Sequence, residues 1–145
     1  MSKSNVFENE LLLHIFNNAA IALVGDATGL RGSAAAGSLY LSLHTADPGE
    51  AGDQSTTEVG YTGYLRVAVA RTSGGFTVTG NAAALAAAVD FPEGTGGAGT
   101  ATHVGIGTSS AGAGKLLYKG ALANPIVCGV GVTPRINAGQ CVTED

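Results

Sequence analysis

Three histidines are the residues of this 145-residue chain best suited to metal binding or proton transfer. They are His14, His44 and His103, and no two of them stand at the HxH or HxxxH spacing that places two imidazoles on one metal ion. The fold would have to bring them together. We therefore expect surface or hydrogen-bonded histidines and no metal site, with the His44 imidazole holding Asp47 and the start of the following loop in place.

A series of carboxylates follows His44 and offers two further kinds of chemistry. Hard cations such as Ca²⁺ need several oxygen ligands, but the DxDxDG spacing of a calcium loop is missing. A pair of carboxylates can also hydrolyse glycosides, yet that chemistry uses a cleft with aromatic walls, and the chain has no Trp and 6% aromatic residues. The sequence favours a solvated acidic loop. Its carboxylates are Asp47, Glu50, Asp53 and Glu58.

The other reactive residue types lack the context that catalysis or cofactor binding requires. Ser109-Ser110 has no GxSxG elbow, and the glycines of 94–99 and 105–107 have neither the GxGxxG nor the GK[ST] context of a phosphate loop. Cys128 and Cys141 have no CxxC spacing, so we expect two reduced core residues, the alternative being a disulfide between neighbouring strands. We predict that the chain is not an enzyme and binds no cofactor.

Composition restricts the partners of the chain. Its length fits one domain, and 45% hydrophobic residues are enough for a core. The net charge of −4, with seven scattered basic residues, argues against nucleic acid. The apolar stretch 11–24 contains His14, Asn17 and Asn18, which argues against a membrane span and against a signal peptide. Only 12% of residues are charged, so the surface is more easily explained if partner proteins cover much of it.

The first 24 residues have the pattern of an amphipathic helix or arm. We expect Asn5 as the N-cap, Glu8 as its capping-box partner and an end near Ala22 to Val24. The apolar stripe is wide enough to pack on the β-domain, on another subunit, or on both. The candidate residues for a subunit interface are Phe7, Leu11, Leu12, Ile15 and Phe16.

A glycine-rich linker, 25–37, leads to a β-domain predicted over 38–145. Its first strand, from Ser38 to His44, alternates three leucines with polar residues, which is typical of one buried face. We expect 64–72 and 76–79 to pair as a hairpin, 81–88 to be extended and 93–101 to be a loop. Further strands are expected at 89–91, 102–108, 115–122, 126–133, 135–136 and 140–143, with turns at 109–114 and 137–139. About eight strands at these spacings predict an all-β, jelly-roll-like antiparallel β-sandwich.

The order of several short motifs carries a family resemblance. A Glu8–His14 helix is followed by LYLSLHTADP (39–48), an acidic loop, and the motifs YLRVAV, VDFP, THVGI and LYKGAL, at 64–69, 89–92, 102–106 and 117–122. The order resembles that of small tailed-phage virion proteins, often labelled tail-fibre proteins, and within them the cementing (decoration) proteins of podophage capsids. The sequence differs from their pattern in the long 25–37 insertion.

The resemblance implies a jelly-roll protein that is assembled in the host cytoplasm and binds the outer surface of the capsid. It would bridge neighbouring major capsid subunits, and a dimer across a two-fold axis is expected. One alternative function is a tail or head-fibre adaptor. The other is a carbohydrate- or host-surface-binding module, which would need exposed aromatics from among Tyr40, Tyr61, Tyr64 and Tyr118.

Overall fold

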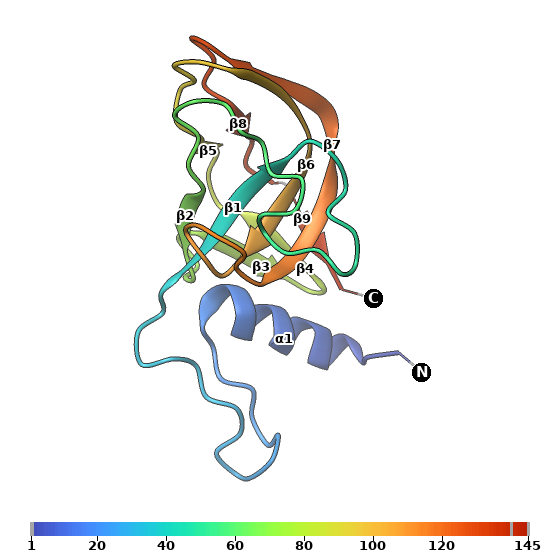
Figure 1. The fold of residues 1–145 in the computed structure, drawn as a ribbon. Helices are drawn as coiled ribbons and strands as arrows, with labels where there is room; N and C mark the ends of the chain where they lie inside the picture. Colours follow the sequence, from blue (N-terminus) through green and yellow to red (C-terminus); the bar gives the residue numbers. More distant parts are fainter. Residues whose placement is uncertain (1, 140, 145) are drawn as a thin grey trace. The chain divides into compact units, whose positions relative to one another are not determined.

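The computed structural model describes residues 2–139 and 141–144, at Cys141 the backbone alone. Within these residues, one helix precedes nine strands (Figure 1), and the strands form antiparallel sheets ordered β2-β1-β6-β7, β3-β4-β9 and β5-β8. The predicted fold class, an all-β antiparallel sandwich with an N-terminal helix, is confirmed. The elements are α1 (Asn5–Asn17), β1 (Ser38–His44), β2 (Val67–Ala70), β3 (Phe76–Thr79), β4 (Ala82–Leu85), β5 (Val89–Asp90), β6 (Ala98–Gly107), β7 (Leu116–Gly129), β8 (Arg135–Ile136) and β9 (Cys141–Thr143).

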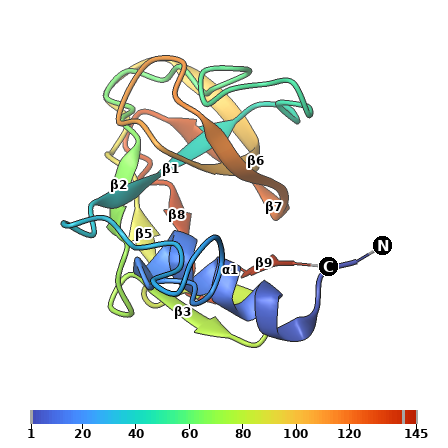
Figure 2. The same cartoon turned by 90° about the horizontal axis from the view of Figure 1, so that it is seen from below.

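The chain divides into two compact units, each built from separate stretches of sequence. Unit 1 contains the residues up to Ser38, Val69–Ala88 and the residues from Asn137 onward, and unit 2 contains Leu39–Ala68 and Val89–Ile136. The sequence predicts consecutive parts instead, at 1–24, 25–37 and 38–145. The units are discontinuous because α1 contacts β3 and β4, and β4 also pairs with β9 (Figure 2).

Helix α1 begins one residue earlier than the sequence predicts and ends at least five residues earlier. Ser4, and not the predicted Asn5, is the N-cap: it is extended, and its Oγ accepts a hydrogen bond from the Phe7 amide at 3.4 Å. The helix ends at Asn17 because Asn18 adopts the left-handed conformation at φ 57°, well before the predicted end. Phe16 is fully buried, and its ring centroid lies 4.8 Å from that of Phe76. Helix α1 has 13 residues, and no helix in the described chain is long and apolar enough to cross a membrane.

The hairpin of unit 1 is formed by β3 and β4, with Phe76 opposite Leu85 and Thr79 opposite Ala82. The predicted extended structure in 81–88 is therefore confirmed at β4, whereas the predicted pairing of 64–72 with 76–79 is wrong. Regular strand structure in 64–72 is limited to β2, which lies next to β1 in the sheet order. Because β4 supplies the nearer antiparallel partner, β3 turns back onto the strand that follows it.

Unit 2 is built on the antiparallel ladder of β1, β6 and β7. Leu41 of β1 lies opposite Ile106 of β6, which in turn lies opposite Tyr118 of β7. β6 already begins at Ala98, inside the predicted loop 93–101, and β7 is one strand where two were predicted. It tolerates Pro125 because it lies at the edge of its sheet and the register of the ladder shifts there.

Both faces of β1 are buried, although the alternation predicts one. The three leucines of the strand lie in the core as expected. Ser42 and His44, on the opposite face, are also 0% exposed. The polar face of β1 is therefore covered by polar groups from elsewhere in unit 2.

Candidate functional site

The covering groups form a buried polar cluster, which we define as Ser42, His44, Gln54, Glu58, Tyr64 and Arg66. Four of its members come from the β1–β2 loop, here residues 45–66, that follows β1. A carbonyl oxygen accepts hydrogen bonds, so Nδ1–H of His44 donates to the Thr56 carbonyl, 2.8 Å away. The Ser42 hydroxyl lies 2.8 Å from Nε2 of His44, and burial lowers the pKa of this histidine. The neutral ring therefore accepts from Ser42 while it donates to Thr56.

This Ser–His pair has the hydrogen bond of an activated nucleophile, with a backbone carbonyl orienting the ring. Both side chains are completely buried, however, and Gly105 of the neighbouring strand lies against them. A substrate cannot reach Ser42 in this conformation. We therefore assign the pair a structural function.

Arg66 connects the β1–β2 loop to the turn between β6 and β7. Its Nε and Nη2 donate to the two carboxylate oxygens of Glu58, each at 2.7 Å, and the guanidinium also donates to the carbonyls of Ser109 and Gly112 at 3.1 and 2.6 Å. Tyr64 donates to Glu58 at 2.8 Å and accepts from the Leu43 amide at 3.0 Å. The hydrogen bonds with Glu58 raise the pKa of Arg66, and burial raises that of Tyr64. At neutral pH, Arg66 therefore stays positively charged and Tyr64 stays neutral.

Gln54 fixes the same two loops at a second point. Its side chain is 0% exposed, donates to the Tyr40 carbonyl at 3.2 Å and accepts from the Ser109 amide at 2.9 Å. Gly107 leaves the space that this amide fills, since a Cβ there would lie 2.1 Å from Cδ of Gln54. The part of the β1–β2 loop around Gln54 and Glu58 is therefore packed, whereas Asp47 and Glu50 are exposed, as expected of a solvated acidic loop.

The structure separates the residues for which the sequence suggested a shared chemistry. His44 does hold the loop, but through Thr56; the prediction that it binds Asp47 is wrong. Asp47 accepts from the Gly49 amide at 2.8 Å and pairs with Lys119 at 3.0 Å, and both contacts lower the pKa of its carboxyl group. The fold does bring His103 opposite His44, on β6. Within the described residues, no group of three or more His, Cys, Asp or Glu could hold a metal ion.

Sequence reasoning missed the residues that organise the cluster. The sequence predicts a strand at the motif that contains Arg66 and Tyr64, and a solvent-exposed loop around Gln54. Nothing in their local sequence indicates a buried role. Of the two cysteines, Cys128 is a free, buried thiol whose pKa burial raises, while the pairing of Cys141 lies outside the described side chains.

The candidate interface residues of α1 have different environments. Leu12 and Phe16 are fully buried within unit 1, Leu11 and Ile15 are partly exposed, and Phe7 is 37% exposed. Leu12 and Phe16 therefore pack inside unit 1. The role of the five residues in a subunit interface stays a prediction.

The segment from 19 to 37 joins α1 to β1, contains the predicted linker 25–37, and is held by hydrogen bonds (Figure 1). Ile21 and Leu30 exchange two backbone hydrogen bonds of 2.9 Å. The Asn18 side chain donates to the Ser33 carbonyl at 2.8 Å and accepts from its amide at 2.7 Å. Backbone and side-chain groups both contribute to these bonds, and the Ile21–Leu30 and Asn18–Ser33 contacts join residues 9 and 15 positions apart.

Arg71 closes the base of the 19–37 segment. Its guanidinium donates to the carbonyls of Ile15 and His14 at the end of α1, at 2.6 and 2.7 Å, and to that of Ala36 at 3.1 Å. The carbonyls at a helix C-terminus carry partial negative charge, which suits this cation. At the cross-strand bonds and beyond them, the segment exposes three apolar side chains: Leu23 (80%), Val24 (40%) and Leu30 (46%).

Arg71→Gln is expected to increase opening of the 19–37 segment roughly tenfold. Each hydrogen bond from a charged donor contributes about 1.5–3 kcal/mol, and about 1.4 kcal/mol is sufficient for a tenfold change. Thermolysin, which cleaves before residues such as Leu23 and Val24, provides the measurement as the initial rate of cleavage in the segment. Arg31→Gln, in the same segment and exposed, is the control and should leave the rate unchanged. Equal rates for both variants would contradict the assignment of Arg71.

The fold and the buried cluster together define a small, β-rich structural module in which polar side chains fix loops and are not presented to a substrate. A family model described as podophage GP4 fiber I protein gp80 matches residues 2–144, and the chain belongs to this family. It is therefore a structural or fibre protein of the phage virion. No curated protein matches the chain.

Proposed function

We propose that this protein binds the outer surface of the capsid and bridges neighbouring major capsid subunits, which stabilises the shell. The observation that carries the proposal is the 19–37 segment. It is closed at its base by Arg71, yet it exposes Leu23, Val24 and Leu30. An ordered apolar projection loses little conformational entropy when a partner covers it.

Many copies on a symmetric lattice would bind more strongly than one contact suggests, because each bridge makes the next contact intramolecular. Self-association of the protein as a dimer belongs to the same proposal. The charge distribution supports protein partners over nucleic acid. Five of the seven basic residues already bind groups of this chain, and they are Lys3, Arg66, Arg71, Lys119 and Arg135.

A fibre adaptor is the second candidate, and the description of the family as a fibre protein favours it. The copy number in the virion separates the two candidates, because a cement protein is present on every capsid face and an adaptor only at the fibre. Quantitative mass spectrometry of purified virions, with imaging of the density, measures it. We propose that either role is non-catalytic.

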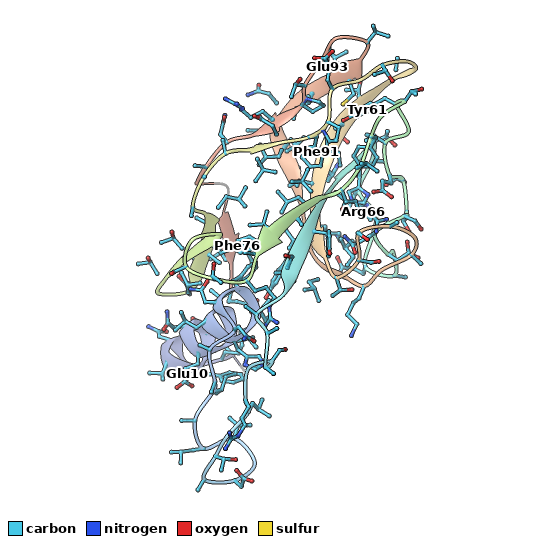
Figure 3. All side chains as sticks on the ribbon, turned by 90° about the vertical axis from the view of Figure 1, so that its left-hand side faces the viewer. Glu10, Tyr61, Arg66, Phe76, Phe91 and Glu93 are labelled. Atoms are coloured by element: carbon cyan, nitrogen blue, oxygen red, sulfur yellow. The ribbon has the colours of Figure 1, made fainter. Side chains whose placement is uncertain are left out.

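The structure gives little support to the carbohydrate-binding alternative. Tyr61 is buried, and its hydroxyl donates to the Pro92 carbonyl at 2.8 Å; burial raises its pKa to about 12. Its ring centroid lies 5.4 Å from that of Tyr64, and the Tyr64 ring stacks on Phe91 at 6.1 Å; Tyr61 and Phe91 are labelled in Figure 3. Two of the four tyrosines are thus core residues and unavailable for stacking on a sugar.

Shells stripped of this protein are expected to lose their genome at a lower temperature than decorated shells, and adding the protein back should restore the difference. Leu23→Ser/Val24→Ser should weaken rebinding at least tenfold, because each buried apolar side chain contributes about 1.5–3 kcal/mol. Val127→Ser, which changes a more exposed valine of unit 2, is the control. If stripped and decorated shells released their genome at the same temperature, the cement function would be excluded. Normal rebinding of the double variant would exclude only the role of the segment.

A further inference from the structure

We propose that the β1–β2 loop is released by acid, because its attachment to β1 requires a neutral His44. The inference concerns the isolated chain and does not depend on capsid binding. It rests on the position of His44 between β1 and the loop, with both ring nitrogens occupied.

His44 joins the two elements at the middle of a short ladder. The Thr45 amide donates to the Thr57 carbonyl at 2.8 Å, and the Val59 amide donates to the Leu43 carbonyl at 2.9 Å. The imidazole adds its bond to the Thr56 carbonyl, next to the Thr57 end of this ladder. Gly105 confines the ring, since even a Cβ there would lie 2.7 Å from Nε2. The ring therefore has no space to turn toward another partner.

Protonation of His44 removes the hydrogen bond that the neutral ring accepts. The new Nε2–H points at Ser42 Oγ, so the hydroxyl proton must turn away from the ring, inside a fully buried site. A buried donor without an acceptor is costly, and a buried imidazolium without a carboxylate partner is costlier. Both costs disappear when the loop detaches and water reaches the ring.

The charged groups that face His44 do not compensate for its charge. Glu58 of the loop is the favourable one, but both its oxygens are held by Arg66, and its Oε1 also accepts from Tyr64. Arg66 and, from β6, His103 disfavour a second positive charge. Burial is the largest influence, and it lowers the pKa of His44 below its ordinary value of 6.5.

Proton binding by His44 and release of the loop are linked, and this linkage sets the direction of the pH dependence. In the released loop the His44 ring is solvated and titrates near 6.5, whereas in the attached loop it resists protonation. Above that pH both states are neutral, and the equilibrium does not depend on pH. Below it the released state binds the proton preferentially, so its population rises up to about tenfold for each pH unit until the attached state also titrates. Asp47 and Asp53 do not interfere in this range, because their pKa values lie below 3.8.

Amide hydrogen exchange of Thr45 and Val59 tests the proposal, measured at pH about 7.5, 6.5 and 5.5 and corrected for the intrinsic exchange rate. We expect their protection to fall by up to about tenfold between the two lower values, relative to the Ile106 amide of β6. The fall should persist in His103→Gln and be absent in His44→Gln. Flat protection in the parent chain, an equal fall at Ile106, or an unchanged fall in His44→Gln would each overturn the proposal.

If His44→Gln fails to fold, an NMR titration of the His44 ring in the parent chain tests the proposal instead. The NMR signals of the His44 ring in the parent chain should stay those of the neutral form until the loop amides lose protection, and both changes should occur together. A ring that titrates near its ordinary value while the loop amides stay protected would overturn the proposal.

Discussion

Gly107→Ala is expected to lower the free energy of unfolding by about 3 kcal/mol, a large effect for one added methyl group. The new Cβ would lie 2.1 Å from Cδ and 2.5 Å from Oε1 of Gln54, far inside van der Waals contact. Gln54 is fully buried and bonded to Tyr40 and Ser109, so it cannot move aside without leaving these partners unpaired. Overpacking and lost hydrogen bonds each cost about 1–3 kcal/mol.

Gly99→Ala is the matched control, because Gly99 lies in the same strand and a Cβ there would meet nothing within 4 Å. That variant should be neutral or slightly stabilised, since alanine restricts the unfolded chain more than glycine does. Urea unfolding followed by circular dichroism gives both free energies. Equal values for the two variants would contradict the packing that we assign to Gln54.

The elements that could be predicted from the sequence are those with a local signal. The alternation of Leu39, Leu41 and Leu43 correctly places β1, and the glycines of 109–114 correctly place a turn. β4 was also predicted, although it is alanine-rich, because strand patterns surround it. In each case the residues that specify the element lie within it or next to it.

The pairing of the strands and the buried cluster could not be predicted, because they depend on contacts between distant residues. Arg66 reaches Ser109 and Gly112, more than 40 positions away, and Arg71 reaches α1, more than 50 positions away. An arginine in an alternating segment is typical of a solvent-facing position, and neither its burial nor its partners are visible locally. The contacts of Glu58 could not be predicted for the same reason. Glu58 looks solvated until the fold places Arg66 beside it.

Arg66→Met is expected to lower the free energy of unfolding by about 3–5 kcal/mol, the cost of removing one partner from a buried ion pair. The substitution keeps most of the side-chain volume but leaves the Glu58 carboxylate facing Tyr64 alone, and it leaves the carbonyls of Ser109 and Gly112 without their donor. The Arg66 side chain is 2% exposed, so water cannot replace these bonds without opening the loop. Urea unfolding measures the effect.

Two further variants show whether the loss comes from the charge left on Glu58. Glu58→Gln/Arg66→Met should recover part of the stability, because the remaining amide carries no net charge and can still accept from Tyr64. Arg135→Met removes an arginine with the same two-point contact to a carboxylate, on Asp90, but both side chains of that pair are about half exposed. It should change stability little, since exposed ion pairs contribute little. A double variant as unstable as Arg66→Met would mean that the lost carbonyl contacts, and not the unpaired carboxylate, hold the β1–β2 loop in place.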